Sequence, residues 1–229
     1  MNLSLSRSFP IAKAALAAAV IACTFALACS LIGCASGGTD SSSADAGNTS
    51  ASTDGKTLRV AMELAYPPFE TKDDAGNPEG LAVDFIRDFG AAYGYDVQIE
   101  NTAWDGLIPS LQSDKADLVI SSMTITDERK QSVDFSDAYA MAQLAILANA
   151  DSGVASIDDL NQPGKKVAVK TGSTGDVYAT KNLADAEIVR LADESACVTE
   201  VVQGKADGFL YDQLTIYRNH QANPDTTEA

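Results

Sequence analysis

The chain has 229 residues, a formal net charge of −16 at pH 7, four cysteines and one histidine. Its length allows one or two domains. A chain this acidic repels phosphate backbones, so nucleic acid is excluded as a partner. His220 is the single histidine of the chain, and one cysteine lies beyond residue 34. These residues are too few for a zinc site or a Cys/His catalytic set. We therefore expect no metal and no cofactor.

Residues 1–33 are predicted to be a secretory signal peptide. Arg7 and Lys13 supply a basic start, and residues 14–32 are almost wholly apolar. A membrane span is the alternative, because the apolar run is close to the ~20 residues that a span needs. The many alanines and the polar tract that follows favour the signal. Its removal takes away two positive charges and no acid, so the formal charge goes from −16 to −18.

The signal ends in Leu-Ile-Gly-Cys at residues 31–34, which resembles the bacterial lipobox. Cys34 is then the predicted lipidation site and the mature N-terminus, with Val-Ile-Ala-Cys at 20–23 as a weaker candidate. Residues 34–56 are rich in Ser, Gly, Ala and Asp and are expected to form a flexible tether to the membrane. Cys197 has no partner for an internal disulfide, so we expect a buried structural thiol.

Strands and helices are expected to alternate from residue 58 onward. The apolar periodicity predicts strands at 58–62, 97–100, 118–120, 144–148, 165–170, 187–191 and 208–211, with helices at 83–93, 104–111, 156–160, 176–183 and 195–203. This order is typical of an α/β protein with mostly parallel sheets and helices on both faces. The pattern starts again after residue 148, which suggests lobes at 57–148 and 149–218, a polar tail at 219–229 and a ligand cleft between the lobes.

The segment 117–136 carries the strongest chemical signal. An apolar run ends at Ser121 and Ser122, and Thr126 with the acids that follow it predicts a helix N-cap. Arg129 lies one turn further on. Free backbone N–H groups and a guanidinium fork together suit a small carboxylate. The plainer alternative is an ordinary helix cap with a surface arginine.

Polar turns at the carboxyl ends of several predicted strands favour the carboxylate site. These turns are residues 63–66, 121–129, 170–174 and 211–212. In open α/β sheets, ligands bind beyond the carboxyl ends of the strands. We therefore expect these four turns to meet at one cleft.

A set of short motifs runs through the chain from residue 58 to about 218. In chain order they are Tyr66-Pro-Pro-Phe-Glu70, Gly80 with Asp84, Trp104-Asp-Gly-Leu-Ile-Pro-Ser-Leu111, Met123-Thr-Ile-Thr-Asp-Glu-Arg129, Asp134-Phe-Ser136, Gly164-Lys-Lys-Val-Ala-Val169, Gly204-Lys-Ala-Asp207 and Asp212. With these motifs in this order, the chain resembles the family-3 extracytoplasmic solute-binding proteins, the amino-acid-binding proteins of ABC importers with the type II two-lobe fold.

The resemblance implies a site for the two charged groups of a free amino acid. Arg129 would bind the α-carboxylate through two hydrogen bonds, and Asp212 would pair with the α-ammonium. Further donors to the carboxylate would come from the hydroxyl or main-chain groups of Ser121, Ser122, Thr124 and Thr174. An N-cap for the following helix is the alternative role of Asp212.

The resemblance also implies a pocket for the ligand side chain. Tyr66 and Trp104 would form its walls, and Glu63 and Lys170 would add polar contacts, which favours a polar or basic amino acid. Without the motifs, the two aromatic residues would be assigned to packing, Glu63 to the surface and Lys170 to a solvated strand end.

The predicted function is a lipid-anchored, extracytoplasmic substrate-binding protein that closes two lobes over an amino acid and delivers it to an ABC permease. No catalytic residue is implied. The alternatives are a dehydratase-like enzyme on the same fold, and a sensor or degenerate paralogue without a transport role. Family members continue past the helix after Asp212 with a return strand and further helices of the first lobe, which are expected to be missing here.

Overall fold

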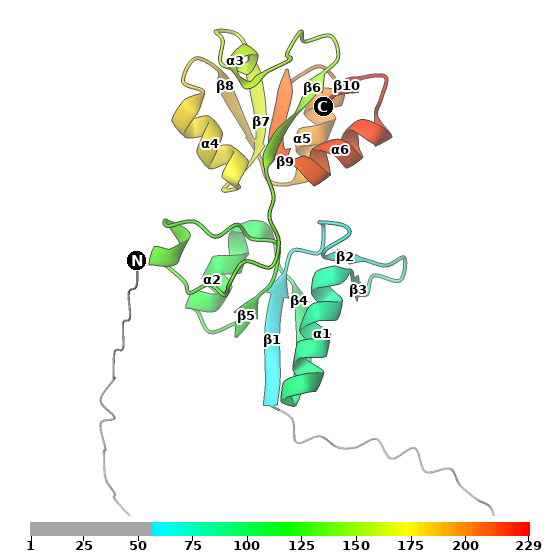
Figure 1. The fold of residues 1–229 in the computed structure, drawn as a ribbon, viewed down its shortest axis with the longest axis vertical. Coiled ribbons are helices and arrows are strands. Elements are labelled where there is room, and N and C mark those ends of the chain that lie inside the picture. The colour runs from blue at the N-terminus through cyan, green and yellow to red at the C-terminus, as the bar shows by residue number, and fades with distance from the viewer. Residues whose placement is uncertain (1–55) are drawn as a thin grey trace, which may run out of the picture. The chain divides into compact units, whose positions relative to one another are not determined.

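The computed structural model describes residues 56–229, shown as a coloured ribbon in Figure 1. The predicted signal peptide, Cys34 and the tether up to residue 55 lie outside this range. Within the described range, no helix is both long enough and apolar enough to cross a membrane.

The first sheet has three parallel strands with β1 in the centre. Its order is β4-β1-β5, where β1 is Lys56–Met62, β4 is Tyr95–Asn101 and β5 is Leu118–Val119. The connections are helix α1 (Leu81–Tyr93), between β1 and β4, and the 3-10 turn η1 (Trp104–Gly106) with helix α2 (Leu107–Gln112), between β4 and β5. Each connection is a parallel crossover that needs a helix, as the alternating pattern predicted.

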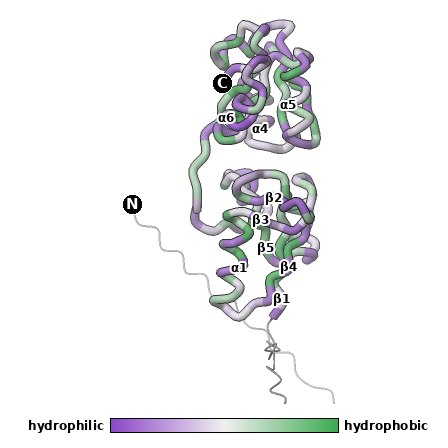
Figure 2. The backbone as a smooth tube through the Cα atoms, turned by 90° about the vertical axis from the view of Figure 1, so that its right-hand side faces the viewer, coloured by the Kyte–Doolittle hydropathy of each residue, from purple (hydrophilic) through white to green (hydrophobic). Residues whose placement is uncertain are grey.

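Both faces of β1 are buried. Val60 and Met62 pack on the α1 side, and Ala61 packs with Leu107 of α2 on the other side. A strand covered on both faces is expected to be apolar at consecutive positions, and residues 60–62 all are. Along α1 the hydrophilic and hydrophobic residues alternate (Figure 2), and its inward face carries Ala82, Val83 and Ile86.

A short hairpin connects β1 to α1. Its strands are β2 (Thr71–Lys72) and β3 (Pro78–Glu79), and the loop before it runs from Glu63 to Glu70. This loop is closed by two hydrogen bonds between the main chains of Tyr66 and Glu70. The loop packs on the start of α1, because the carbonyls of Pro68 and Phe69 accept from the N–H groups of Leu81 and Ala82, 3.0 and 2.8 Å away.

The second sheet has five strands in mixed orientation. Its order is β10-β6-β9-β7-β8, with β6 at Leu144–Asn149, β7 at Lys166–Lys170, β8 at Glu187–Leu191, β9 at Gly208–Asp212 and β10 at Thr227–Glu228. β7 is parallel to β8 and β9, whereas β6 is antiparallel to both β9 and β10. The helices are α3 (Ile157–Leu160), α4 (Thr174–Asn182), α5 (Glu194–Val202) and α6 (Gln213–Ala222).

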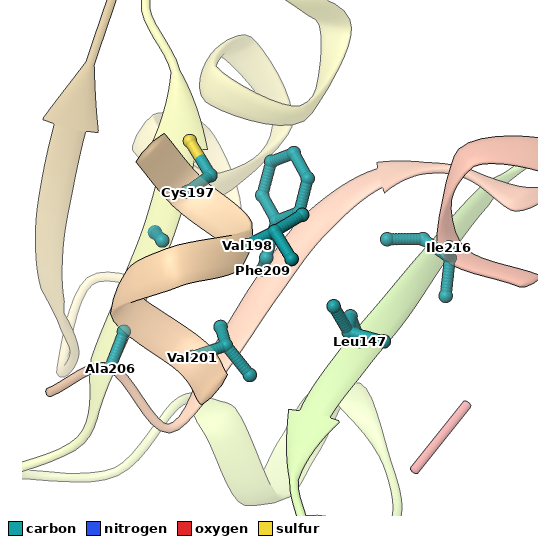
Figure 3. Packing of buried hydrophobic residues seen from close by; sticks show 8 residues of the cluster. Leu147, Cys197, Val198, Val201, Ala206, Phe209 and Ile216 are labelled. Carbon is teal, nitrogen blue, oxygen red and sulfur yellow. The ribbon is translucent and has the colours of Figure 1, made fainter. Parts of the chain in front are cut away.

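Two buried clusters hold the second sheet between its helices. Leu147, Phe209 and Ile216 belong to the cluster that includes α5 and α6 (Figure 3). Cys197 lies in the same cluster with no exposed surface, and burial raises the pKa of its thiol to about 12. The expectation of a buried thiol is confirmed.

Two local predictions differ from the structure. The helix predicted to start at Thr126 is a single 3-10 turn, η2 (Arg129–Gln131), after irregular chain from residue 120. Only Val133 follows as an apolar residue before Phe135, so no apolar stripe exists to pack a longer helix against the sheet. The tail at 219–229 is also more ordered than predicted, because α6 extends to Ala222 and β10 pairs with β6.

Candidate functional site

Arg129 is half-buried where the irregular segment meets η2. Its Nη1 donates to the Thr124 carbonyl at 2.7 Å, and its Nη2 donates to the Gly172 carbonyl at 3.0 Å. The guanidinium also lies over the ring of Trp104, 5.4 Å from the ring centroid. Burial lowers the pKa of Arg129, but a guanidinium stays charged at any physiological pH. A fixed positive charge is therefore present at the predicted carboxylate site.

The two serines near Arg129 have different partners. Ser121 is buried, and its Oγ accepts from the backbone N–H of Glu63 at 2.9 Å. Ser122 has a left-handed backbone (φ 49°), and its N–H donates to the hydroxyl of Tyr139 at 3.1 Å. The Ser121 hydroxyl therefore joins two chain segments, and the Ser122 N–H faces a polar oxygen.

The loop after β7 is organised by a buried carboxylate. Asp176 accepts from the N–H of Gly172 and from Nε of Arg190, each at 2.9 Å. Ser173 caps α4 by accepting from the N–H of Asp176, and Thr174 is the first residue of that helix. These contacts turn the Gly172 carbonyl toward Arg129 and place Thr174 near the same loop.

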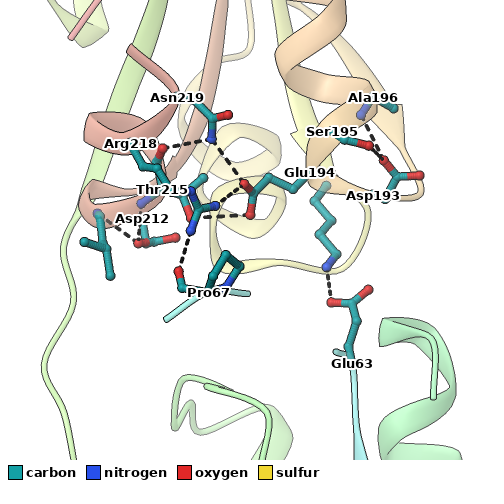
Figure 4. A network of polar contacts seen from close by, with 12 residues as sticks. Glu63, Pro67, Asp193, Glu194, Ser195, Ala196, Asp212, Thr215, Arg218 and Asn219 are labelled. Carbon is teal, nitrogen blue, oxygen red and sulfur yellow. Dashed lines mark hydrogen bonds and ion pairs between the residues drawn. The ribbon is translucent and has the colours of Figure 1, made fainter. Parts of the chain in front are cut away.

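Lys170 and Glu63 form an ion pair (Figure 4). Lys170 ends β7 and is 3% exposed, and its Nζ lies 5.1 Å from the centroid of the Trp104 ring. Lys170 is therefore not a solvated strand end, and Glu63 is not a free surface acid. The single tryptophan ring is flanked by two cations, Lys170 and Arg129.

Asp212 has a capping role and one free oxygen. Its Oδ1 accepts from the N–H groups of Leu214 and Thr215 at 3.0 and 3.1 Å, so the predicted N-cap exists. Its Oδ2 is buried without a hydrogen-bond partner among the described residues. Burial, and then the Asp212 carboxylate, raise the pKa of Tyr66. A buried carboxylate oxygen without a donor is costly, which makes it a candidate acceptor for a ligand.

Three polar residues at this site were not predicted from the sequence. Arg218 of α6 donates to the Pro67 carbonyl and to the carboxylate of Glu194, 2.7 Å away (Figure 4). Burial, and then the charges of Glu194 and Asp212, raise the pKa of Tyr211. Tyr211 precedes Asp212 in β9, which could have identified it, whereas no motif distinguishes Arg218 or Glu194.

The described residues contain no group of three or more side chains arranged to hold a metal ion. The site is instead built from paired charges, aromatic rings and main-chain carbonyls. These groups come from the ends of strands β1, β7 and β9 and from the segment after β5. An α/β fold of two lobes with polar groups at its strand ends defines a protein that binds a small polar solute.

The match to a family model identifies one family within this class of binding proteins. Residues 58–222 match the bacterial extracellular solute-binding proteins, family 3, and the chain belongs to that family. The matched range contains every predicted ligand-binding residue, from Glu63 to Asp212.

Individual proteins agree with this assignment. The chain is 36% identical over 201 residues to a probable histidine-binding protein of Neisseria gonorrhoeae, covering 87% of this chain and 74% of that protein. Among solved structures, it is 40% identical to an ancestral amino-acid-binding protein described as a precursor of cyclohexadienyl dehydratase, with a TM-score of 0.68 and coverage of 72% and 75%. A mutant of the arginine-bound arginine-binding protein of T. maritima has 37% identity, a TM-score of 0.69 and coverage of 74% and 79%.

One similar protein is an enzyme. A cyclohexadienyl dehydratase of Pseudomonas aeruginosa is 26% identical over 170 residues, covering 73% of this chain and 63% of that protein. The chain thus spans about two thirds to four fifths of the length of these four proteins.

Proposed function

We propose that this protein is the substrate-binding component of an ABC importer and captures one free amino acid by closure of its two lobes. The observation that carries the proposal is the presence of a partly buried cation, Arg129, and a buried carboxylate oxygen, Asp212 Oδ2, that has no hydrogen-bond partner among residues 56–229. Tyr211 acts to raise the pKa of Arg129, and Asp212 raises the pKa of Tyr211, which supports a position of both charges near this tyrosine. A cation and an anion at one site complement the zwitterion of an amino acid.

The pair of Lys170 and Glu63 bears on which amino acid is bound. A basic ligand would need Glu63 for its own cation, but Lys170 already holds that carboxylate. Together the pair offers one donor and one acceptor, which suits a neutral polar side chain such as an amide. Of the two classes that the residues favour, polar and basic, this contact supports the polar one.

Calorimetric titration of the purified protein with each of the twenty amino acids tests the proposal. We expect one or a few polar amino acids to bind. Arg129→Ala should then cost about 3–5 kcal/mol of binding free energy, because the ligand carboxylate loses its counter-charge in a buried site. Lys130→Ala is the matched control, since Lys130 is the exposed neighbour and has only a 3.8 Å ion pair with Asp127. Equal affinity of the Arg129 variant and the control would refute the site.

A dehydratase is the second candidate, because one relative is named as an enzyme of that kind. It would act on a prephenate-like acid and would need a general acid at the site, for which Glu63 and Asp212 are the candidates from the sequence. Incubation of the protein with prephenate or arogenate decides between the two functions. Turnover that is lost in Asp212→Asn would favour the enzyme, and binding of amino acids without turnover would favour the transport protein.

We also propose that Cys34 carries a lipid that holds the protein at the outer face of the cell membrane. The lipobox-like residues 31–34 and the Ser/Gly-rich tract after them support this. Stable anchoring requires more than one acyl chain, because a single chain binds membranes only marginally. In a bacterial host, Cys34→Ala should move the protein from the membrane fraction to the soluble fraction, and Cys23→Ala should not. The reverse result would assign the lipid to Cys23.

A further inference from the structure

Glu70 is a buried acid that the proposed binding function leaves without a role. It follows the Pro67-Pro68 loop and has no exposed surface. Its Oε2 accepts from the Ser122 hydroxyl at 3.1 Å, whereas its Oε1 is buried without a partner among residues 56–229. An ionised carboxylate has room for about four donors. With a single neutral donor, the charged form of Glu70 is strongly disfavoured.

The charged groups around Glu70 do not compensate for this burial. The pKa of Glu70 is raised to about 8, mainly by burial and also by the charge of Glu63, although the Ser122 hydroxyl and Lys170 act to lower it. Lys170 itself pairs with Glu63. The phenols of Tyr66 and Tyr139 also face Glu70, and both have raised pKa values. Glu70 is therefore a neutral carboxylic acid at pH 7.

Ser122 connects Glu70 to the predicted carboxylate site. Its hydroxyl donates to Glu70, and its N–H donates to the Tyr139 hydroxyl at 3.1 Å. A left-handed backbone is unfavourable for a serine, so contacts on both sides of the residue are needed to hold it. The Tyr139 oxygen thus occupies the position from which a ligand carboxylate oxygen would accept the hydrogen bond of the Ser122 N–H.

We propose that neutral Glu70 is a positioning residue that holds Ser122 for the ligand carboxylate, and that Tyr139 occupies the Ser122 N–H until the ligand displaces it. Ionised Glu70 would place a second negative charge beside that carboxylate. Ligand binding is then linked to retention of the Glu70 proton, and affinity falls as the pH rises through about 8. The inference rests on the proposed function for its ligand measurements, but not for the measurement without ligand.

The ligand measurement uses calorimetric titration with L-glutamine and L-arginine from pH 6 to 9.5. In the wild type, affinity should fall above pH 8 by up to tenfold per pH unit relative to Glu70→Gln, which keeps the shape of the neutral acid. Glu79→Gln, an exposed glutamate of β3, is the control and should follow the wild type. Tyr139→Phe should raise affinity several-fold, because it removes the competing oxygen. A constant ratio between wild type and Glu70→Gln over this range would overturn the proposal.

The measurement without ligand follows thermal unfolding from pH 5 to 8.5. Between the ordinary pKa of a glutamate and about 8, the folded protein keeps the Glu70 proton and the unfolded chain loses it. Stability contributed by this proton is therefore lost as the pH rises. The melting temperature should fall more steeply with pH in the wild type than in Glu70→Gln. Equal slopes would overturn the inference even if an amino acid binds, whereas unequal slopes would support the buried proton on Glu70 on which the inference depends, whether or not an amino acid binds.

Discussion

At the scale of single residues, the two cations of the site, Arg129 and Lys170, already have partners within the chain. Two main-chain carbonyls accept from Arg129, and Lys170 is paired with Glu63. A ligand that binds therefore replaces these contacts with its own. Its binding free energy is the difference between the free energies of the two sets of contacts. Specificity should depend on which internal pair is easiest to replace.

Lys170→Met tests this exchange, because methionine keeps much of the length of lysine and removes its charge. We expect Glu63 to be left without a counter-ion, so that affinity for L-arginine rises and affinity for L-glutamine falls. A tenfold change in the ratio of the L-arginine affinity to the L-glutamine affinity corresponds to about 1.4 kcal/mol, which calorimetry resolves.

Lys181→Met serves as the control, because Lys181 is exposed on α4. A ratio that stays the same in both variants would show that Lys170 does not determine specificity.

At the scale of elements, the alternation of apolar segments was enough to predict the order of the main strands and helices. The segment after β5 was predicted wrongly, because a threonine followed by two acids suits both the cap of a helix and the start of a single 3-10 turn. Thr126 does cap locally, since its hydroxyl accepts from the N–H of Arg129 at 3.2 Å. What decides between the two is an apolar stripe, and the segment has none.

The partners of the site residues were less predictable than the residues themselves. Motifs identified Arg129, Lys170 and Asp212, but the contact of Arg129 with Gly172 joins residues 43 positions apart. The hydrogen bond that Glu70 accepts likewise comes from Ser122, 52 positions away. Such contacts are set by tertiary packing, which a single sequence does not reveal.

A substitution at Gly80 tests the packing of the prolyl loop against the start of α1. It has φ 119°, and a Cβ at this position would lie 2.7 Å from the Pro68 carbonyl oxygen. Gly80→Ala should therefore push the prolyl loop off the start of α1 and lower the free energy of unfolding by about 1–3 kcal/mol.

Gly76→Ala is the matched control, because Gly76 also has a positive φ, 87°, but a Cβ added there would meet nothing within 4 Å. Chemical denaturation measures both. An equal loss in the two variants would assign the effect to backbone conformation and exclude the contact with the loop.

At the scale of the whole molecule, residues of the two lobes contact each other directly. Lys170 pairs with Glu63, and Arg129 and Arg218 donate to carbonyls of the opposite lobe. These contacts are made between groups of the protein itself. The two lobes therefore have stabilising interactions of their own, and a ligand needs to supply only part of the free energy that brings them together.

Arg218→Met should shift the ligand-free protein toward an open form. The lost hydrogen bond to Pro67 is worth about 1.5 kcal/mol, the lower end for a charged donor, because the side chain is partly exposed. Small-angle X-ray scattering should show a larger radius of gyration without ligand.

Arg87→Met is the control, since Arg87 also donates to a proline carbonyl, that of Pro78, within the first lobe. An unchanged radius in Arg218→Met would show that this contact does not hold the lobes together.

The position of Trp104 has a spectroscopic consequence. It is the only tryptophan of the chain, and the Arg129 and Lys170 cations lie 5.4 and 5.1 Å from its ring centroid. Indole emission responds to nearby charge, so any rearrangement of these two cations changes the colour or intensity of the fluorescence. All tryptophan emission of the protein thus comes from the proposed ligand site, and an unlabelled sample carries its own optical reporter of the occupancy of that site.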